Sequence, residues 1–432
     1  MKKNTIKLPW GSWYLDTELE LEAPPNWDVQ TLSMNGPFDF TDEDIENAFE
    51  NPIGSPRISE LAKGKKTVVI ATDDHTRPTP TGKLLRYITK ELYAAGIKQE
   101  DITIIMSFGA HRALARPELK MKLGEDVVDN FAVYNHNCYE NLVDLGTTSY
   151  GSPIHINRMY YEADLKIGVG LIVQHPIAGF GAGGKIVLPG VSGIDSLDKT
   201  HTPAADGVTG AIIDIKNKFR DEIEEIARIA GLDVIVNAMC RSNTEMAGLV
   251  VGDFIEAHRV GVERAKQIYA TPCDSYGIAD LAICNTYPFD LDVIQIIRAL
   301  NPFAMGNAEI VREGGTIVMC SAAPEGGGFH FMSSKGGRLF RSIDDFGKVG
   351  RILSGRKVYV FSPNLSPTDV RDYVPHATLF KKWEDVVSQI QRDSGQEPLK
   401  TVVFPYAPMQ IVHKVTDGVM DTEAAALQFA HA

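Results

Sequence analysis

Short runs of β-branched and apolar residues recur along this chain, and each run is followed by a polar or glycine-rich loop. The run T-V-V-I-A-T at 67–72 lacks the polar alternation of a half-exposed strand, so it predicts a parallel strand buried on both faces. An amphipathic helix is predicted at 83–95, and further strands at 102–106 and 165–173. This alternation predicts an α/β fold with a mostly parallel sheet flanked by helices.

A second set of α/β elements begins near residue 279, with strands predicted at 279–285, 316–320 and 357–361 and a helix at 291–300. With 432 residues the chain is also too long for one compact core. We therefore expect two domains joined at Thr271-Pro272, with an active site in the cleft between them. The expected N-terminal domain is 1–270, rejoined by 402–432 because chain ends often lie close together, and the C-terminal domain is 271–401.

Polar side chains follow the predicted strands of the first domain, at the point where each strand ends. In open α/β sheets the carboxyl ends of the strands form the edge where ligands bind. We therefore expect one rim to carry a set of polar side chains from separate loops: Asp74, Arg77, His111, His175 and Lys185.

The glycine-rich segment that follows the third predicted strand matches two nucleotide-binding patterns incompletely. Gly179-x-Gly181-x-x-Gly184 fits the dinucleotide fingerprint, but a β-type run is predicted at 185–189 where that site requires a helix. The same glycines and Lys185 resemble a P-loop, but Ile186 stands where the P-loop needs a hydroxyl for magnesium. Two interpretations of the segment remain. Its backbone amides and the lysine bind a phosphate, or the segment is a tight turn with a lysine on the surface.

Three of the 11 histidines stand in these loops: His111, His175 and His201. Three histidines with one open position are typical of catalytic zinc, so a metallohydrolase is one interpretation. Against it, the sequence shows neither i, i+4 spacing nor an adjacent glutamate base. Two histidines in one cleft are also a suitable acid–base pair, since imidazole titrates near neutrality and a racemase needs a group on each side of a carbon. His136 is a weaker candidate for the same work.

The loop that follows the first strand reads D-D-H-T-R-P-T-P, at 73–80. Its two prolines stiffen the backbone, and a restrained Arg77 is suited to binding a carboxylate or phosphate through two parallel hydrogen bonds. The alternative is a loop that only leads into the following helix, with Thr79 or Thr81 as its cap.

Charge and cysteine usage exclude several classes of function. The net charge of −13 argues against a nucleic-acid partner, although it allows a small anion to bind in a locally basic pocket. The five cysteines are scattered and lack any C-x-x-C, which fits a reducing cytoplasm. No signal segment or bilayer-spanning run is predicted, so we expect a cytoplasmic protein that does not interact with membranes.

Several of these motifs together resemble the lactate racemase family. The similarity lies in D-H-T-R-P (74–78), G-A-H-R (109–112), H-P-I-A-G-F-G-A-G-G-K-I-V-L-P-G (175–190) and Y-P-F-D-L-D-V-I-Q-I-I-R (287–298), together with His201. It extends from about residue 65 over most of the chain, and the glycine–lysine block is its most specific part.

The resemblance implies a nickel-pincer nucleotide, a pyridinium mononucleotide whose two sulfur-containing arms and ring carbon bind nickel, which other proteins must synthesise. It implies a reaction in which a 2-hydroxy acid is racemised or epimerised through a 2-keto acid, by reversible hydride transfer to this cofactor. The implied roles are covalent attachment for Lys185, nickel binding for His201, acid–base chemistry for His111 and His175, substrate binding for Arg77, Gln295 and Arg298, and cofactor binding for Asp74, Thr76, Gly183 and Gly184.

Two positions depart from the lactate-specific pattern. Arg298 stands where the lactate enzyme has lysine, and Ile294 where it has tyrosine. Arg298 supplies a planar guanidinium, and Ile294 makes the wall of the expected site more apolar. These changes do not select one substrate from lactate, malate, a larger 2-hydroxy acid and a sugar acid. A three-histidine metallohydrolase and a non-catalytic cofactor carrier are the alternatives from other classes.

Overall fold

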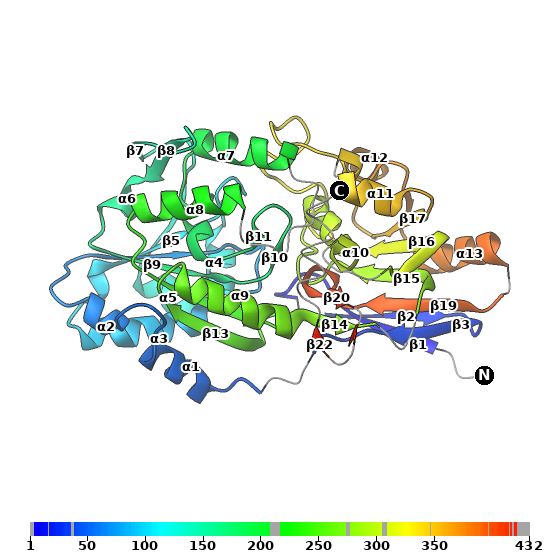
Figure 1. The fold of residues 1–432 in the computed structure, drawn as a ribbon, viewed down its shortest axis with the longest axis horizontal. Coiled ribbons are helices and arrows are strands. Elements are labelled where there is room, and N and C mark those ends of the chain that lie inside the picture. The colour runs from blue at the N-terminus through cyan, green and yellow to red at the C-terminus, as the bar shows by residue number, and fades with distance from the viewer. Residues whose placement is uncertain are drawn as a thin grey trace.

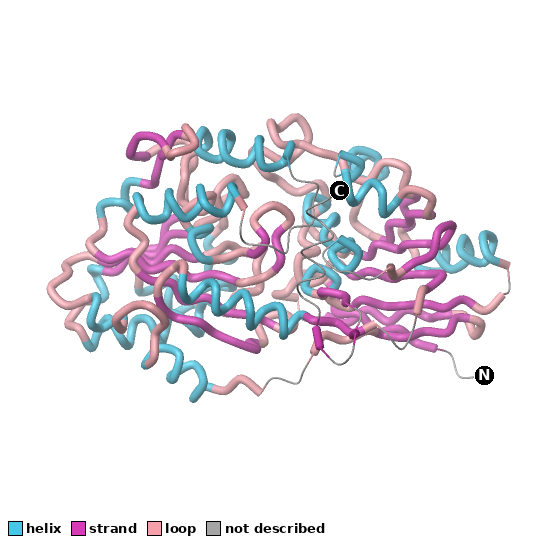
Figure 2. Tube along the Cα trace, in the orientation of Figure 1, coloured by secondary structure: helices cyan, strands magenta, loops and turns pink. Residues whose placement is uncertain are grey.

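The computed structural model describes residues 4–420 except 16, 36–38, 208–216, 274–276, 305–308, 346, 396, 414, 417 and 418. Two six-stranded sheets lie side by side with helices packed around them (Figures 1 and 2). This is the α/β architecture expected from the sequence. Within the described residues, none of the helices is long and apolar enough to cross a bilayer.

The first sheet has the strand order β13-β12-β9-β4-β5-β6, and only β13 runs antiparallel. From the central β4 the chain moves first to β5 and β6, and then returns to β9 on the other side. Loops that leave β4 and β9 therefore diverge, which opens a crevice at their carboxyl ends. The bounds are β4 (Val68–Thr72), β5 (Ile102–Met106), β6 (Ala132–Asn135), β9 (Leu165–Leu171), β12 (Val234–Cys240) and β13 (Met246–Gly252).

Helices and short hairpins complete this domain. In α3, the buried Leu84, Leu85, Ile88 and Leu92 recur at helical spacing and form the stripe that packs on the core. The helices are α1 (Asp42–Glu50), α2 (Ile58–Leu61), α3 (Thr81–Ala94), η1 (Gln99–Asp101), α4 (Arg116–Leu123), α5 (Glu125–Asn130), α6 (Arg158–Glu162), η2 (Gly183–Ile186), α7 (Ile194–Gly207), α8 (Lys218–Ile229) and α9 (Glu256–Tyr269). The hairpins are β7 (Leu142–Thr147) with β8 (Pro153–Asn157), and β10 (Gln174–His175) with β11 (Gly179–Phe180).

The second sheet is parallel throughout, in the order β18-β17-β16-β15-β19-β3. Its strands are β3 (Trp27–Thr31), β15 (Ala279–Asn285), β16 (Val311–Cys320), β17 (Lys357–Phe361), β18 (Thr378–Phe380) and β19 (Leu399–Phe404). Its helices are η3 (Val293–Leu300), α10 (Asn301–Ala304), η4 (Ile343–Asp345), α11 (Gly347–Leu353), α12 (Pro367–Tyr373), α13 (Trp383–Ser394) and η5 (Ala407–Met409). Short pairs are formed by β14 (Ala270–Pro272) with β20 (Ile411–His413) and by β21 (Val415–Thr416) with β22 (Val419–Met420).

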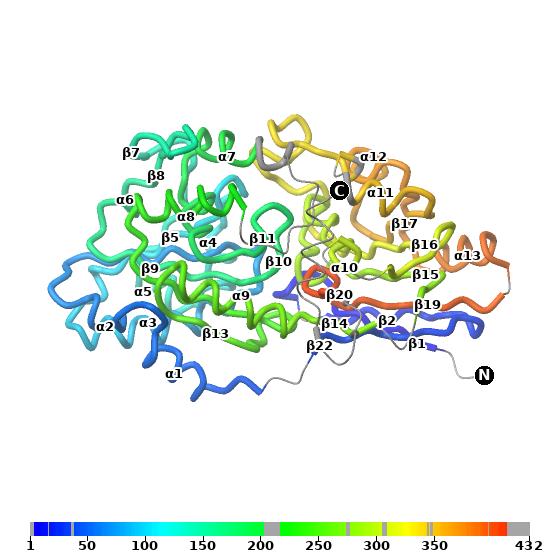
Figure 3. The backbone as a smooth tube through the Cα atoms, in the orientation of Figure 1, coloured from blue at the N-terminus to red at the C-terminus, as the bar shows by residue number. Residues whose placement is uncertain are grey.

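The first strands of the chain pack with the second sheet, so the expected boundaries need correction. The hairpin of β1 (Asn4–Trp10) and β2 (Thr17–Ala23) shares a core with β15 and α13, and β3 pairs with β19, as the blue and red segments of Figure 3 show. The described start of 402–432 likewise stays with the second sheet and β14. Residues 421–432 lie outside the described part. The first domain is thus inserted between β3 and β14.

The individual elements were predicted more accurately than their grouping. All three strands expected in the second set are present, and the expected helix at 291–300 is the 3₁₀ helix η3. The β-type run expected at 185–189 is absent, because η2 and successive turns occupy that segment.

Candidate active site

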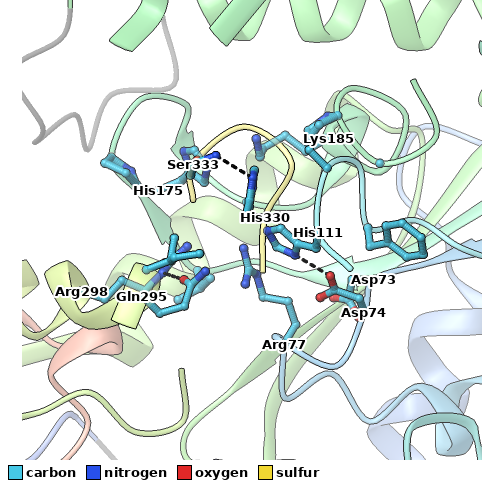
Figure 4. Close-up of a pocket in the computed structure, with 18 of the residues that line it drawn as sticks. Asp73, Asp74, Arg77, His111, His175, Lys185, Gln295, Arg298, His330 and Ser333 are labelled. Atoms are coloured by element: carbon cyan, nitrogen blue, oxygen red, sulfur yellow. Dashed lines mark hydrogen bonds and ion pairs between the residues drawn. The ribbon is translucent and has the colours of Figure 1, made fainter. Parts of the chain in front are cut away.

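A cavity of about 310 Å³ lies between the two domains, within the usual size range of ligand sites. Loops after β4, β5 and β9 line one side, and η3 with the loop after β16 lines the other. Figure 4 shows the polar side chains that converge on it. The structure brings together seven of the predicted site residues here: Asp74, Arg77, His111, His175, Lys185, Gln295 and Arg298; His201 also lines the cavity.

Asp74 and His111 form a hydrogen-bonded pair at the ends of β4 and β5. The Asp74 carboxylate accepts from His111 Nδ1 at 2.5 Å, and from the backbone amide and hydroxyl of Thr76. Burial alone would raise the pKa of Asp74, but the neighbouring His111 outweighs this effect and holds it well below the usual range. Because a carboxylate can only accept, the proton lies on Nδ1 and His111 Nε2 is left as a base.

His175 carries the opposite tautomer. Its Nδ1 accepts from the backbone amides of Ile177 and Ala178, at 3.3 and 3.2 Å, so a neutral ring has its hydrogen on Nε2. Burial, followed by the charges of Lys185, Arg298 and Arg77, lowers the pKa of His175 well below its ordinary value. The two predicted acid–base residues therefore present one acceptor and one donor.

Lys185 reaches the cavity from a loop that a buried arginine holds in place. Arg220 donates to the carbonyls of Ala178, Phe180 and Ala182, which lie just before Lys185 in sequence. The Lys185 amine lies 5.5 Å from the centre of the Phe219 ring. Burial, then the charges of Arg220, Arg77 and Arg298, lowers its pKa well below the ordinary value. An amine whose pKa is lowered loses its proton more readily and is then a nucleophile.

Two glycines of this segment, Gly183 and Gly184, pack closely against neighbouring residues and do not face the cavity. A Cβ on Gly183 would lie 2.9 Å from the His258 ring, and one on Gly184 would lie 3.1 Å from Ile223 and Ala227. The Gly183 amide donates to Asn237 Oδ1, so it is already satisfied. Neither glycine lines the cavity, whereas Gly170 and Gly181 do. The structure thus gives Gly183 and Gly184 a packing role, and their predicted contact with the cofactor stays a prediction.

His201 lies in α7, and among the described residues the hydrogen bonds of its ring are made by Nδ1. Its Nδ1 lies 3.1 Å from the carbonyl of Leu197, so this nitrogen carries the hydrogen and Nε2 keeps its lone pair. Burial, reinforced by the charge of Lys185, lowers its pKa to about 3. A neutral imidazole fixed by a backbone carbonyl is the form that coordinates metals.

Two arginines from different domains stack on one aromatic ring. The guanidinium carbons of Arg77 and Arg298 lie 5.4 and 4.9 Å from the centre of the Phe289 ring. Gln295 Oε1 accepts from Arg298 Nε at 2.7 Å, while the buried Nη1 of Arg298 has no hydrogen-bond partner among the described residues. Burial and then the charge of Arg77 lower the pKa of Arg298 well below its usual value. Two adjacent cations with an unpaired donor indicate an anion-binding site.

One functional candidate, His330, was missed from the sequence. It lines the cavity from the loop after β16, and its ring centre lies 4.8 Å from that of His111. In sequence it is a lone histidine in G-G-G-F-H-F, a pattern that indicates only a loop. His136, by contrast, is buried and bonded to Ser192 and Asn157 away from the cavity.

The three histidines do not form a zinc site. In the described part of the chain, the group whose ligand atoms approach within 4.8 Å of one another is His75, Glu118 and Glu325. Arg112 is bonded to both of those glutamates and supplies the positive charge there. The geometry therefore disfavours a three-histidine metallohydrolase.

The low pKa of Lys185 predicts selective labelling by cyanate near neutral pH. A lysine whose pKa is lowered on folding loses its proton at a lower pH than an ordinary lysine. Lys185 should therefore react with cyanate faster than the exposed Lys199. The difference between the two rates should persist when the pH is lowered. Peptide mass spectrometry of timed samples measures both rates. Equal rates at the two sites would contradict the lowered pKa of Lys185.

Comparison with known proteins identifies relatives of this chain. The family model for the lactate racemase N-terminal domain matches residues 14–208. The lactate racemase of Lactiplantibacillus plantarum is 32% identical over 292 residues, which span 66% of this chain and 67% of that protein. The lactate racemase of Thermoanaerobacterium thermosaccharolyticum is 31% identical over 338 residues, spanning 75% of each.

Solved structures share the fold. The lactate racemase apoprotein from Thermoanaerobacterium thermosaccharolyticum superposes with a TM-score of 0.73 at 24% identity, covering 95% of this chain and all of that one. A protein from Thermotoga maritima gives a TM-score of 0.62 at 16% identity, covering 84% of this chain and all of its own. With two relatives above 30% identity over at least two thirds of their length, the chain belongs to the lactate racemase family, a family of isomerases.

Proposed function

We propose that this protein racemises or epimerises a 2-hydroxy acid, using a nickel-pincer nucleotide attached to Lys185. The observation that carries the proposal is that Lys185, whose pKa is lowered by burial, lines the same cavity as the two arginines and the two histidines of opposite tautomer. Bound there, the cofactor would reversibly accept the hydride of the substrate α-carbon. Lys185 would hold it through a thioamide, and His201 Nε2 would complete the nickel coordination.

The protein residues supply position and proton transfer. Arg77 and Arg298 would bind the substrate carboxylate, with Gln295 fixing the Arg298 fork through its 2.7 Å hydrogen bond. His111 would take the hydroxyl proton, and Asp74 would stabilise the imidazolium that results. A carboxylate between the arginines also offsets two of the charges that depress the pKa of His175, so substrate binding would raise that pKa toward neutrality.

The remaining predicted roles are part of this proposal. Asp74 and Thr76 would border the cofactor, and cofactor-synthesis proteins would be required for maturation. Ile294 lines the cavity, so its apolar side chain would face the substrate tail. A 2-keto acid would form between the two transfers and present its other face before the hydride returns.

Intact-protein mass spectrometry tests the attachment. Protein coexpressed with the cofactor-synthesis enzymes should carry an adduct that maps to Lys185, together with nickel in metal analysis. Unmodified Lys185 with zinc as the bound metal would contradict the proposal. Chiral chromatography over lactate, malate, larger 2-hydroxy acids and sugar acids then identifies the substrate, and racemisation of none of them would refute the proposed reaction.

A further inference from the structure

The loop that carries His330 crosses from the second domain to the first. This crossing loop, residues 321–340, donates from the Phe331 amide to the carbonyl of Ala110 at 2.8 Å, beside a backbone bridge between His330 and His111. Arg112, which follows His111, is bonded to Glu325 in the same loop. His330 is therefore fixed against the segment that carries His111.

The hydrogen bonds of His330 determine which nitrogen carries its hydrogen. Its Nδ1 accepts from the backbone amides of Met332 and Ser333, at 3.1 and 3.0 Å; Figure 4 draws the second of these. Since an amide can only donate, a neutral ring has its hydrogen on Nε2. Burial, and then the neighbouring His111 and His201, holds the pKa of His330 well below its ordinary value, so the ring stays neutral.

His330 and His111 thus form a donor–acceptor pair at one edge of the cavity. His111 Nε2 offers a lone pair because Asp74 holds the hydrogen on Nδ1, whereas His330 Nε2 offers an N–H. The rings meet edge to face, with an interplanar angle of 63°. A hydroxyl group complements such a pair, since it can donate to the first nitrogen and accept from the second.

We propose that His330 is a further catalytic residue, which donates its Nε2–H to the substrate oxygen from which His111 takes the proton. This rests on the proposed function. The O–H bond of the substrate breaks, and the proton passes to His111 Nε2. The electron pair of that bond stays on the oxygen and forms the C=O bond. The α-hydrogen leaves with the electron pair of the C–H bond to the hydride acceptor named above. The N–H of His330 stabilises the negative charge that develops on that oxygen.

Two substitutions separate this donor role from packing. His330→Phe keeps an aromatic ring against His111 but removes the N–H, whereas His330→Gln keeps an N–H donor near the same position. We expect the phenylalanine variant to lose about 10²- to 10³-fold in kcat with little change in KM, the effect of deleting one oxyanion donor. Its kinetic isotope effect with α-deuterated substrate should rise, and the glutamine variant should recover at least part of kcat. Unchanged kcat in His330→Phe, or equal losses in both variants, would overturn the proposal.

A second measurement does not depend on turnover. In unloaded protein labelled with ¹⁵N-histidine, the spectrum should show His330 with its proton on Nε2, identified by its loss in His330→Phe, and oxamate should shift that signal. A proton on Nδ1, or a signal unmoved by saturating oxamate, would overturn the role of His330. If the loaded wild-type protein turns over no 2-hydroxy acid, the proposed function fails, and the oxamate titration still decides whether His330 binds the substrate-like oxygen.

Discussion

Lys185→Arg is expected to abolish both cofactor attachment and racemisation. Arginine stays protonated, so it lacks the nucleophilic amine that the lowered pKa of Lys185 favours. Intact mass after coexpression should show no adduct, and the chiral assay should fall to background. The free energy of unfolding should change little, because the side chain lines a cavity and is not packed in the core.

Lys199→Arg is the matched control for this experiment. Lys199 is exposed on α7, two residues before His201, and does not line the cavity. That variant should load and turn over like the wild type. Retention of the adduct in Lys185→Arg would show that the cofactor is attached elsewhere, and the proposed function would lose its main support.

His111→Asn and His175→Asn are each expected to lower racemisation by about 10²- to 10⁴-fold while the cofactor stays bound. Each substitution removes one of two proton-transfer groups, and neither residue is assigned to cofactor attachment. The adduct mass and nickel content measure loading, and the chiral assay measures turnover in both directions. Asp74→Asn should reproduce much of the His111 defect, because an amide can donate to Nδ1 and so favour the tautomer that leaves no base at Nε2.

His155→Asn provides a control for histidine replacement as such. His155 lies on β8 and does not line the cavity. If either cavity variant kept turnover close to that of His155→Asn, the two-base scheme would be wrong. A loss of cofactor together with activity would instead give that histidine a binding role.

The local elements were predictable because each is encoded by neighbouring residues. The continuous apolar run at 67–72 is β4 within one residue, and its burial on both faces explains why it lacks alternation. The grouping of polar side chains at one edge of the first sheet was also predictable, because parallel strands place their carboxyl ends at the same edge. That rule predicts that His111 and Asp74 lie near one another, and the two side chains share a 2.5 Å hydrogen bond.

What the sequence could not predict depends on partners far along the chain. The sequence of β3, Trp27–Thr31, does not indicate that this strand pairs with β19 instead of with the first sheet. His330 reaches the cavity from a loop of the second domain that contacts Ala110 and Arg112 of the first. The packing of Gly183 against His258 and of Gly184 against α8 was not predicted, because a glycine pattern does not distinguish contact with a ligand from contact with a neighbouring helix.

The insertion of the first domain between β3 and β14 has a consequence for synthesis on the ribosome. Trp27 is almost fully buried in the finished protein, and Trp383 bonds to the carbonyl of Glu22, 361 residues earlier in the chain. At about 5–20 residues per second, the ribosome needs on the order of 20–70 s to supply that partner. The inserted domain has its own core and can fold meanwhile, but the apolar faces of the N-terminal strands stay without these partners until the ribosome has passed Trp383.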